Sequence, residues 1–153
     1  PQHLGRVIHQ LGLIQINDSL DLGCGTGLSG IVLREVSKHL TGVDIAGKML
    51  AHAKDKKIYD RLVESELTKF LQQDKQCYDL IVSADVLPYF SDLEPLFKLI
   101  SQHLKQKAYF IFTTEISDTN NWTLESSARF SHNPNYIQTL CTKYQLQLIS
   151  QEK

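Results

Sequence analysis

The segment that links the first predicted strand to the following helix reads Asp21-Leu22-Gly23-Cys24-Gly25-Thr26-Gly27. Its glycines let the backbone turn tightly and approach a ligand with no Cβ in the way. The preceding residues, Asn17 to Leu22, predict a short strand, and apolar residues three and four apart predict a helix from Leu28 to Leu40. A glycine-rich turn from strand to helix is typical of ligand sites in α/β proteins.

The same alternation of strand and helix continues along the chain. Further strands are predicted over Thr41 to Ile45, Asp60 to Val63, Tyr78 to Ala84, Ala108 to Thr114 and Gln145 to Ser150. Further helices are predicted over residues 2 to 12, 48 to 57, 68 to 73, 92 to 104 (with Ser91 as its cap) and 135 to 144, and a polar stretch spans 115 to 134. This order predicts a doubly wound, mainly parallel sheet with helices on both faces.

Length and composition fit one domain over residues 1–153. The only methionine is Met49, so we expect the chain to be truncated at one or both ends.

A formal net charge of -1 argues against a strong phosphate-binding field and hence against a nucleic-acid partner. No apolar run approaches the roughly 20 residues of a membrane span. Cys24, Cys77 and Cys141 are scattered, which favours a reducing, cytoplasmic location without disulfides.

The glycine loop is compatible with two kinds of ligand. The stretch from Gly25 to Gly30 satisfies GxGxxG, and Asp44 follows 19 residues after Gly25, as in dinucleotide sites. Asp21 argues against that interpretation, because its carboxylate would oppose a pyrophosphate placed over the loop. A cationic cofactor without phosphate, such as S-adenosylmethionine, suits an acidic residue here. Asp44 would accept hydrogen bonds from ribose hydroxyls in either case.

Three stretches resemble successive motifs of the class I S-adenosylmethionine-dependent methyltransferases: DLGCGTG at 21–27, GVDIAGKMLAHA at 42–53 and YDLIVSADVLPYF at 78–90. KKIYDRL at 56–62, SADVLPYFSDL at 83–93 and ARFSHNPNYI at 128–137 are similar to a subgroup often fused to tetratricopeptide repeats. The resemblance covers residues 20 to about 148. It implies the Rossmann-like methyltransferase fold, S-adenosylmethionine as cofactor and S-adenosylhomocysteine as product.

The resemblance also implies a set of cofactor-binding residues. Ile45 and Met49 would lie against the adenosine, although core packing at helical spacing is the alternative for both. Glu66 would meet the adenine amino group, with Glu64 as an alternative, and Leu67 would contribute a backbone contact. The full set is Asp21, Gly23, Cys24, Gly25, Asp44, Ile45, Met49, Glu66, Leu67 and Ser83.

Three residues are candidates for the acceptor side, namely Asp85, Tyr89 and His132. Asp85 follows the strand end toward which the transferred methyl should point, where it would orient the acceptor, act as a base or cap the next helix. Tyr89, like Glu115, is expected to form a pocket wall. His132 matches the family's Arg-aromatic-small-His stretch, and its alternative role is structural. No metal site is expected, because the histidines lack metal-ligand spacing.

The reaction implied is an in-line displacement, in which a base is needed only if the acceptor must lose a proton. A small-molecule acceptor is expected because the near-zero net charge gives no sign of a basic surface for a nucleic-acid acceptor. The alternatives are an NAD(P)-dependent oxidoreductase and a catalytically silent cofactor-binding domain. The resemblance also implies a last, antiparallel strand beside the strand from Ala108 to Thr114, and we expect it to be missing from residues 1–153. We therefore expect either self-association through the open edge of that strand or a longer chain whose further residues fill the edge.

Overall fold

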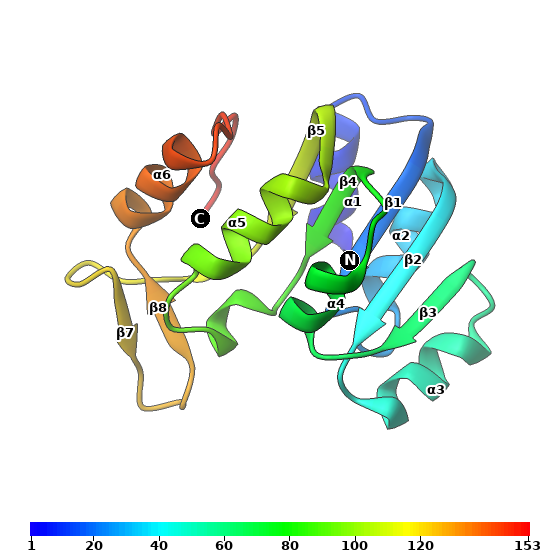
Figure 1. Cartoon of the computed structure of the whole chain (residues 1–153), viewed down its shortest axis with the longest axis horizontal. Helices are drawn as coiled ribbons and strands as arrows, with labels where there is room; N and C mark the ends of the chain where they lie inside the picture. The colour runs from blue at the N-terminus through cyan, green and yellow to red at the C-terminus, as the bar shows by residue number, and fades with distance from the viewer.

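The computed structural model describes residues 1–153 (Figure 1). In chain order its elements are α1 (Gln2–Gln10), β1 (Ile16–Leu22), α2 (Leu28–Val36), β2 (Ser37–Asp44), α3 (Gly47–Asp55), β3 (Arg61–Glu64), α4 (Leu67–Gln73), β4 (Tyr78–Ser83), the 3-10 turn η1 (Leu87–Tyr89), α5 (Glu94–His103), β5 (Leu104–Phe112), β6 (Glu115–Ile116), β7 (Trp122–Leu124), β8 (Phe130–His132) and α6 (Pro134–Lys143). Every helix is too short or too polar to cross a membrane.

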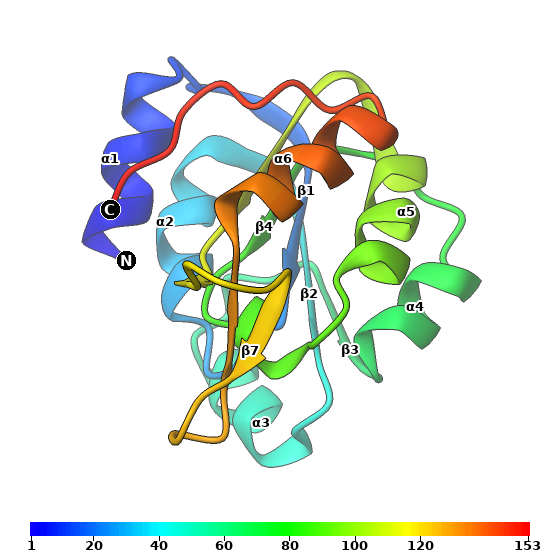
Figure 2. The same ribbon diagram turned by 90° about the vertical axis from the view of Figure 1, so that its left-hand side faces the viewer.

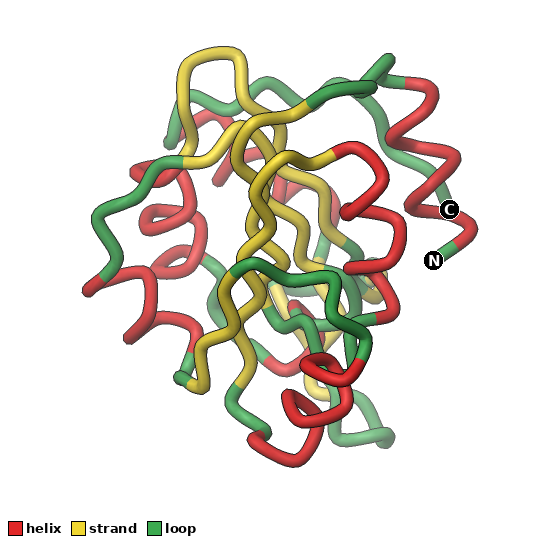
Figure 3. The backbone as a smooth tube through the Cα atoms, turned by 90° about the vertical axis from the view of Figure 1, so that its right-hand side faces the viewer, coloured by secondary structure: helices red, strands yellow, loops and turns green.

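The main sheet has the strand order β3-β2-β1-β4-β5, and all its pairings are parallel. The order reverses between β1 and β4, which places the topological switch point at the carboxyl end of β1. Helices cover both faces of the sheet (Figure 3). The predicted doubly wound, parallel fold is therefore confirmed.

Two apolar cores hold the helices against the sheet. The larger core packs α4, α5 and α6 on one face, around Leu20 and Leu22 of β1. The smaller core packs α1 and α2 on the other face, around Leu80 and Val82 of β4. Because β4 contributes side chains to both cores, its sequence from Tyr78 to Ser83 is nearly continuously apolar.

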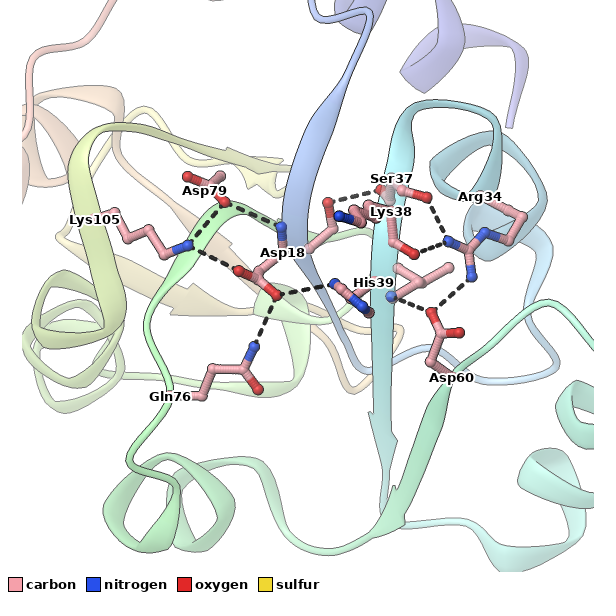
Figure 4. Close-up of polar contacts among 11 residues, drawn as sticks. Asp18, Arg34, Ser37, Lys38, His39, Asp60, Gln76, Asp79 and Lys105 are labelled. Carbon is pink, nitrogen blue, oxygen red and sulfur yellow. Dashed lines mark hydrogen bonds and ion pairs between the residues drawn. The ribbon is translucent and has the colours of Figure 1, made fainter.

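An ionic network joins the amino ends of three strands (Figure 4). Lys105 of β5 donates to Asp18 of β1 at 2.8 Å and to Asp79 of β4 at 3.1 Å. Asp79 also accepts the backbone N–H of Asp18 at 3.0 Å. The network thus fixes the register of the sheet at the end opposite the glycine loop.

The boundary between α2 and β2 differs from the prediction. The helix ends at Val36 rather than Leu40, and β2 begins at Ser37 rather than Thr41. The Ser37 hydroxyl donates to the Ser19 hydroxyl at 2.7 Å, and the Arg34 guanidinium donates to the carbonyl oxygens of Ser37 and Lys38. These contacts hold residues 37 to 40 beside β1, although their apolar spacing also suits a helix.

Other boundaries also differ from the prediction. The predicted strand Gln145 to Ser150 is not formed, and this segment runs back toward α1, where Glu152 accepts from Arg6 at 3.0 Å (Figure 2). The polar stretch from 115 to 134 contains a second sheet in the order β6-β8-β7. The helix α5 begins at Glu94, and Asp92 rather than Ser91 accepts its backbone N–H, at 2.9 Å.

The strand β5 is the outer strand of the main sheet. It begins at Leu104, four residues before the predicted start at Ala108. Phe110 and Phe112 pack edge-on against Phe97 of α5, with ring centroids 5.7 and 5.5 Å from it. No other strand pairs with the outer edge of β5 within residues 1–153.

Candidate functional site

The glycine loop lies between the carboxyl ends of β1 and β2. Gly23, Gly25 and Gly27 all adopt positive φ, at 81°, 53° and 90°, a conformation that residues with a Cβ rarely adopt. The backbone N–H groups of Gly23 and Cys24 donate to the Val43 carbonyl at 2.8 and 2.9 Å. The loop is therefore held on the end of β2.

The loop has one packed side and one open side. A Cβ at Gly23 would come within 2.2 Å of Val86, so that glycine faces the interior of the protein. A Cβ at Gly25 would meet only the Met49 sulfur, at 3.9 Å. Gly25 therefore marks the side from which a ligand can reach the backbone.

Asp44, at the tip of β2, contacts this loop directly. One carboxylate oxygen accepts the Gly25 N–H at 2.8 Å, and the other accepts the Ala46 N–H at 2.8 Å. Each carboxylate oxygen has a further acceptor position, because it carries two lone pairs. The two sequence features from which a cofactor site is predicted, the glycine loop and Asp44, thus contact each other directly.

Ile45 and Met49 are exposed beside Asp44. Their relative accessibilities are 67% and 47%, so neither residue is part of the core. Core packing, the alternative that the sequence left open for them, is wrong. Uncovered apolar side chains next to a hydrogen-bonding carboxylate are suited to a ligand with an apolar ring and a polar sugar.

Asp21 lies beneath the loop rather than on its open side. It is 1% exposed, and the Tyr59 hydroxyl donates to its carboxylate at 2.7 Å. Burial raises the pKa of Asp21 to about 7. Tyr59 was not among the predicted site residues, although the KKIYDRL stretch contains it.

Four other predicted residues have structural contacts. Glu66 caps α4, and its carboxylate accepts the N–H groups of Thr68 and Lys69 at 3.0 and 3.1 Å. Leu67 is buried in the larger core. The Ser83 hydroxyl is buried and donates to the Leu22 carbonyl at 3.2 Å. Burial raises the pKa of the Cys24 thiol to about 12, which makes it a poor nucleophile.

On the other side of the switch point, Arg129 joins Asp85, Tyr89 and Glu115, and we call these four residues the Arg129 cluster. The guanidinium donates to Asp85 and to Glu115 at 2.5 Å each, and to the Tyr89 hydroxyl at 3.2 Å. It also lies over the Tyr89 ring, 5.1 Å from the centroid. The structure thus brings two predicted acceptor-side residues together through an arginine that had no predicted role.

Asp85 has an unusual backbone conformation. Its φ is +59°, and its N–H donates to the Thr113 hydroxyl at 2.8 Å. Such a conformation costs free energy in a non-glycine residue, and residues of this kind gather at functional sites. The helix-capping alternative for Asp85 receives no support, since α5 takes its capping contact from Asp92.

His132 is fully buried on β8, outside the Arg129 cluster. Its Nε2 contacts the Phe90 carbonyl at 2.8 Å, and its Nδ1 contacts the Thr114 hydroxyl at 2.6 Å. Burial lowers the pKa of its imidazole, which favours the neutral ring. Both ring nitrogens are occupied, so the geometry supports a structural role.

Known proteins are similar to this chain in sequence. A model described as a methyltransferase domain matches residues 20–112. The chain belongs to this family. The methyltransferase domain is 32% identical over 130 residues to the ribosomal protein L11 methyltransferase of Lachnospira eligens, covering 77% of this chain and 39% of that protein. It is 23% identical over 128 residues to a ubiquinone biosynthesis O-methyltransferase of Yersinia pestis, covering 81% of this chain and 53% of that protein.

Solved structures show the same fold. A S-adenosylmethionine-dependent methyltransferase from Clostridium acetobutylicum aligns with a TM-score of 0.73 at 20% identity, covering 95% of this chain and 78% of that one. Magnesium protoporphyrin IX methyltransferase from Synechocystis, with bound S-adenosylmethionine, aligns at 0.75 and 17% identity, covering 97% and 70%. The methyltransferase domain spans only 39% and 53% of the two curated relatives named above.

Proposed function

We propose that this methyltransferase domain binds S-adenosylmethionine and transfers its methyl group to a small-molecule acceptor in the cytoplasm. The observation that carries the proposal is the direct contact between Asp44 and the glycine loop, a hydrogen bond of 2.8 Å from the Gly25 N–H. Membership of the methyltransferase domain family supports the reaction class. We also propose that the chain is related to the methyltransferase subgroup that is often fused to tetratricopeptide repeats.

The residues present fit this cofactor. The open side of the loop at Gly25 has room for a ligand against the backbone, and Asp44 has free acceptor positions for two ribose hydroxyls. Ile45 and Met49 are exposed where an adenine ring would cover them. In the proposal Glu66 and the N–H of Leu67, at the start of α4, lie at the adenine edge, and Gly23, Cys24 and Ser83 shape the loop and the neighbouring strand end.

When bound, S-adenosylmethionine supplies a methyl group on a sulfonium, and a nucleophile that takes the methyl leaves S-adenosylhomocysteine as a neutral thioether. The leaving group needs no proton, so the main contribution of the protein is to hold the two reactants in line. We assign the cofactor to Asp44, Ile45 and Met49, and the acceptor to Asp85 and Tyr89. His132 would hold β8 against the segment around Phe90.

The proposed acceptor class has support from one relative and from charge. The name of the Yersinia pestis relative refers to ubiquinone biosynthesis, in which the methylated compound is a small molecule. The Lachnospira eligens relative is named for a ribosomal protein instead. The net charge of -1 gives no general attraction for nucleic acid.

A labelled methyl group tests the proposal. The full chain is incubated with S-adenosylmethionine labelled on the methyl, together with either the low-molecular-weight fraction or the protein fraction of a cell extract. We expect label in small molecules, with much less for Asp44→Ala and full transfer for the distant control Arg6→Gln. Label confined to protein would contradict the acceptor class. Absence of transfer to either fraction would contradict the activity.

A further inference from the structure

Resting on the proposed function, we infer that Arg129 binds an oxyanion of the acceptor, a carboxylate or phosphate-type group, at the position that Asp85 occupies in this structure. The Asp85 carboxylate then occupies the position on Arg129 that the acid group of the acceptor takes when it binds. The inference makes the acceptor a small organic acid.

Arg129 has two anchors that do not depend on Asp85. Its Nε donates to Glu115 at 2.5 Å, which fixes one edge of the guanidinium. The Tyr89 ring lies under the guanidinium, with the centroid 5.1 Å from Cζ, and the Tyr89 hydroxyl accepts from Nη1 at 3.2 Å. A guanidinium held by a carboxylate and an aromatic ring stays oriented when a third partner leaves.

Asp85 is the partner that can leave. Its side chain is 73% exposed, against 40% for Glu115 and 24% for Arg129. An ion pair with such an exposed carboxylate contributes little net free energy, because water solvates the separated charges almost as well. An acceptor carboxylate can therefore replace it on Nη2 at little cost.

A cationic acceptor fits this cluster less well. Asp85 and Glu115 both already bind Arg129, and the guanidinium covers the Tyr89 ring. An ammonium group would have to bind the remaining oxygen of Asp85 beside the guanidinium, whose positive charge repels a cation, whereas an oxyanion pairs with the guanidinium itself. The charge of Arg129 therefore favours an anion.

Position also favours Arg129 as the acceptor's partner. Asp85 and Tyr89 directly follow β4, next to the switch point of the sheet, and Glu115 follows β5. The other arginines have different locations: Arg6 pairs with Glu152, Arg34 with Asp60, and Arg61 with Asp74. Among the arginines, Arg129 alone lies at the carboxyl end of β4.

Calorimetry on the full chain tests the inference with acetate, benzoate and inorganic phosphate as anionic probes, and benzylammonium as a cationic probe. Each probe is titrated with and without saturating S-adenosylhomocysteine. The variants are Asp85→Asn, Arg129→Gln and Arg129→Lys, with Arg6→Gln as a matched surface control. Thermal unfolding of each variant confirms that it is folded.

At least one anion should bind the wild type and bind Asp85→Asn several-fold more tightly, because the internal competitor is gone. Arg129→Gln should weaken that anion by about 10- to 100-fold, the range for a hydrogen bond to a charged group. Arg129→Lys should weaken the binding of benzoate more than that of phosphate, because the lysine ammonium lacks the planar fork of the guanidinium. Arg6→Gln should match the wild type.

Several results would overturn the inference. The first is an affinity for anions that is the same in Arg129→Gln as in the wild type. The second is tighter binding of benzylammonium than of the anions, lost in Asp85→Asn. The third is that no anion binds either the wild type or Asp85→Asn. Binding of S-adenosylhomocysteine alone is a separate measurement. If S-adenosylhomocysteine does not bind, the proposed function is contradicted. If it binds and the anions do not, only the role of Arg129 is contradicted.

Discussion

The hydroxyl of Tyr59 donates a 2.7 Å hydrogen bond to the buried carboxylate of Asp21, directly beneath the glycine loop. The Tyr59 side chain also fills the space beside Gly30 and Gly42, where an added Cβ would come within 2.2 Å of its hydroxyl and 2.7 Å of its ring. Burial raises the pKa of Asp21 to about 7, so this carboxyl titrates near neutral pH. The support of the loop therefore includes a group that changes charge under ordinary conditions.

Asp21→Asn is expected to stabilise the protein at pH 8. The pKa of Asp21 is about 7 in the folded chain and near 3.8 when unperturbed, so the folded state binds more protons between these values. The free energy of unfolding then falls as pH rises from about 4 to about 7. The difference between these two pKa values corresponds to about 4 kcal/mol as an upper bound. Urea unfolding should show the variant more stable at pH 8 and equal near pH 4, and a difference independent of pH would contradict the assignment.

Gly30→Ala tests the packing of Tyr59. The added Cβ would meet the Tyr59 hydroxyl at 2.2 Å, and overpacking of this kind typically costs about 1–3 kcal/mol. Gly5→Ala is the matched control, because its Cβ would make an ordinary 3.6 Å contact with Val32 of α2 and should stabilise α1 by roughly 0.5–1 kcal/mol. Thermal unfolding compares the two. Equal melting temperatures would show that Tyr59 moves aside without cost.

His132→Asn distinguishes a structural from a catalytic histidine. Removing the hydrogen bonds to the Phe90 carbonyl and the Thr114 hydroxyl should cost about 1–3 kcal/mol of stability. Burial lowers the pKa of His132 below its usual 6.5, so the folded state binds fewer protons and the stability that depends on the neutral ring is lost as pH falls below about 6.5. That loss should disappear in the variant.

The rate of methyl transfer provides the second measurement for His132. It should change little where the variant is folded, and its pH profile should match the wild type. A rate loss of about 100-fold at unchanged stability would instead place His132 in the reaction.

Self-association through the edge of β5, over Ala108 to Thr114, stays a prediction. The strand is the outer one of the sheet, and an unpaired edge is a template for pairing with another chain. Light scattering at increasing concentration should show a mass above that of the 17.4 kDa monomer. A mass that stays monomeric at every concentration would contradict it.

The parallel sheet could be predicted from sequence because strands and helices alternate along the chain and because β4, Tyr78 to Ser83, is buried and nearly continuously apolar. The second sheet could not. Its strands of two and three residues are too short to show a period, and Glu115 pairs with Ser131 only through the tertiary fold. The boundary at Val36 was missed because the spacing of Val36 and Leu40 also suits a helix.

The contact between the glycine loop and Asp44 was predictable from the order of the elements. The glycine loop and Asp44 each follow a strand, and parallel strands bring their carboxyl ends together. Arg129 was missed, since its partners Asp85 and Tyr89 lie 44 and 40 residues away along the chain. A surface arginine in a polar stretch has no local pattern that shows which carboxylate it will meet.

Titration of S-adenosylhomocysteine and of NAD into the purified chain tests the central claim most directly. Calorimetry should show that S-adenosylhomocysteine binds and that NAD has no useful affinity. Asp44→Ala should lose much of that affinity, because hydrogen bonds to a charged acceptor contribute about 1.5–3 kcal/mol each. Asp85→Ala should retain it, since Asp85 lies on the acceptor side. Tighter binding of NAD than of S-adenosylhomocysteine, or equal losses in the two variants, would contradict the account.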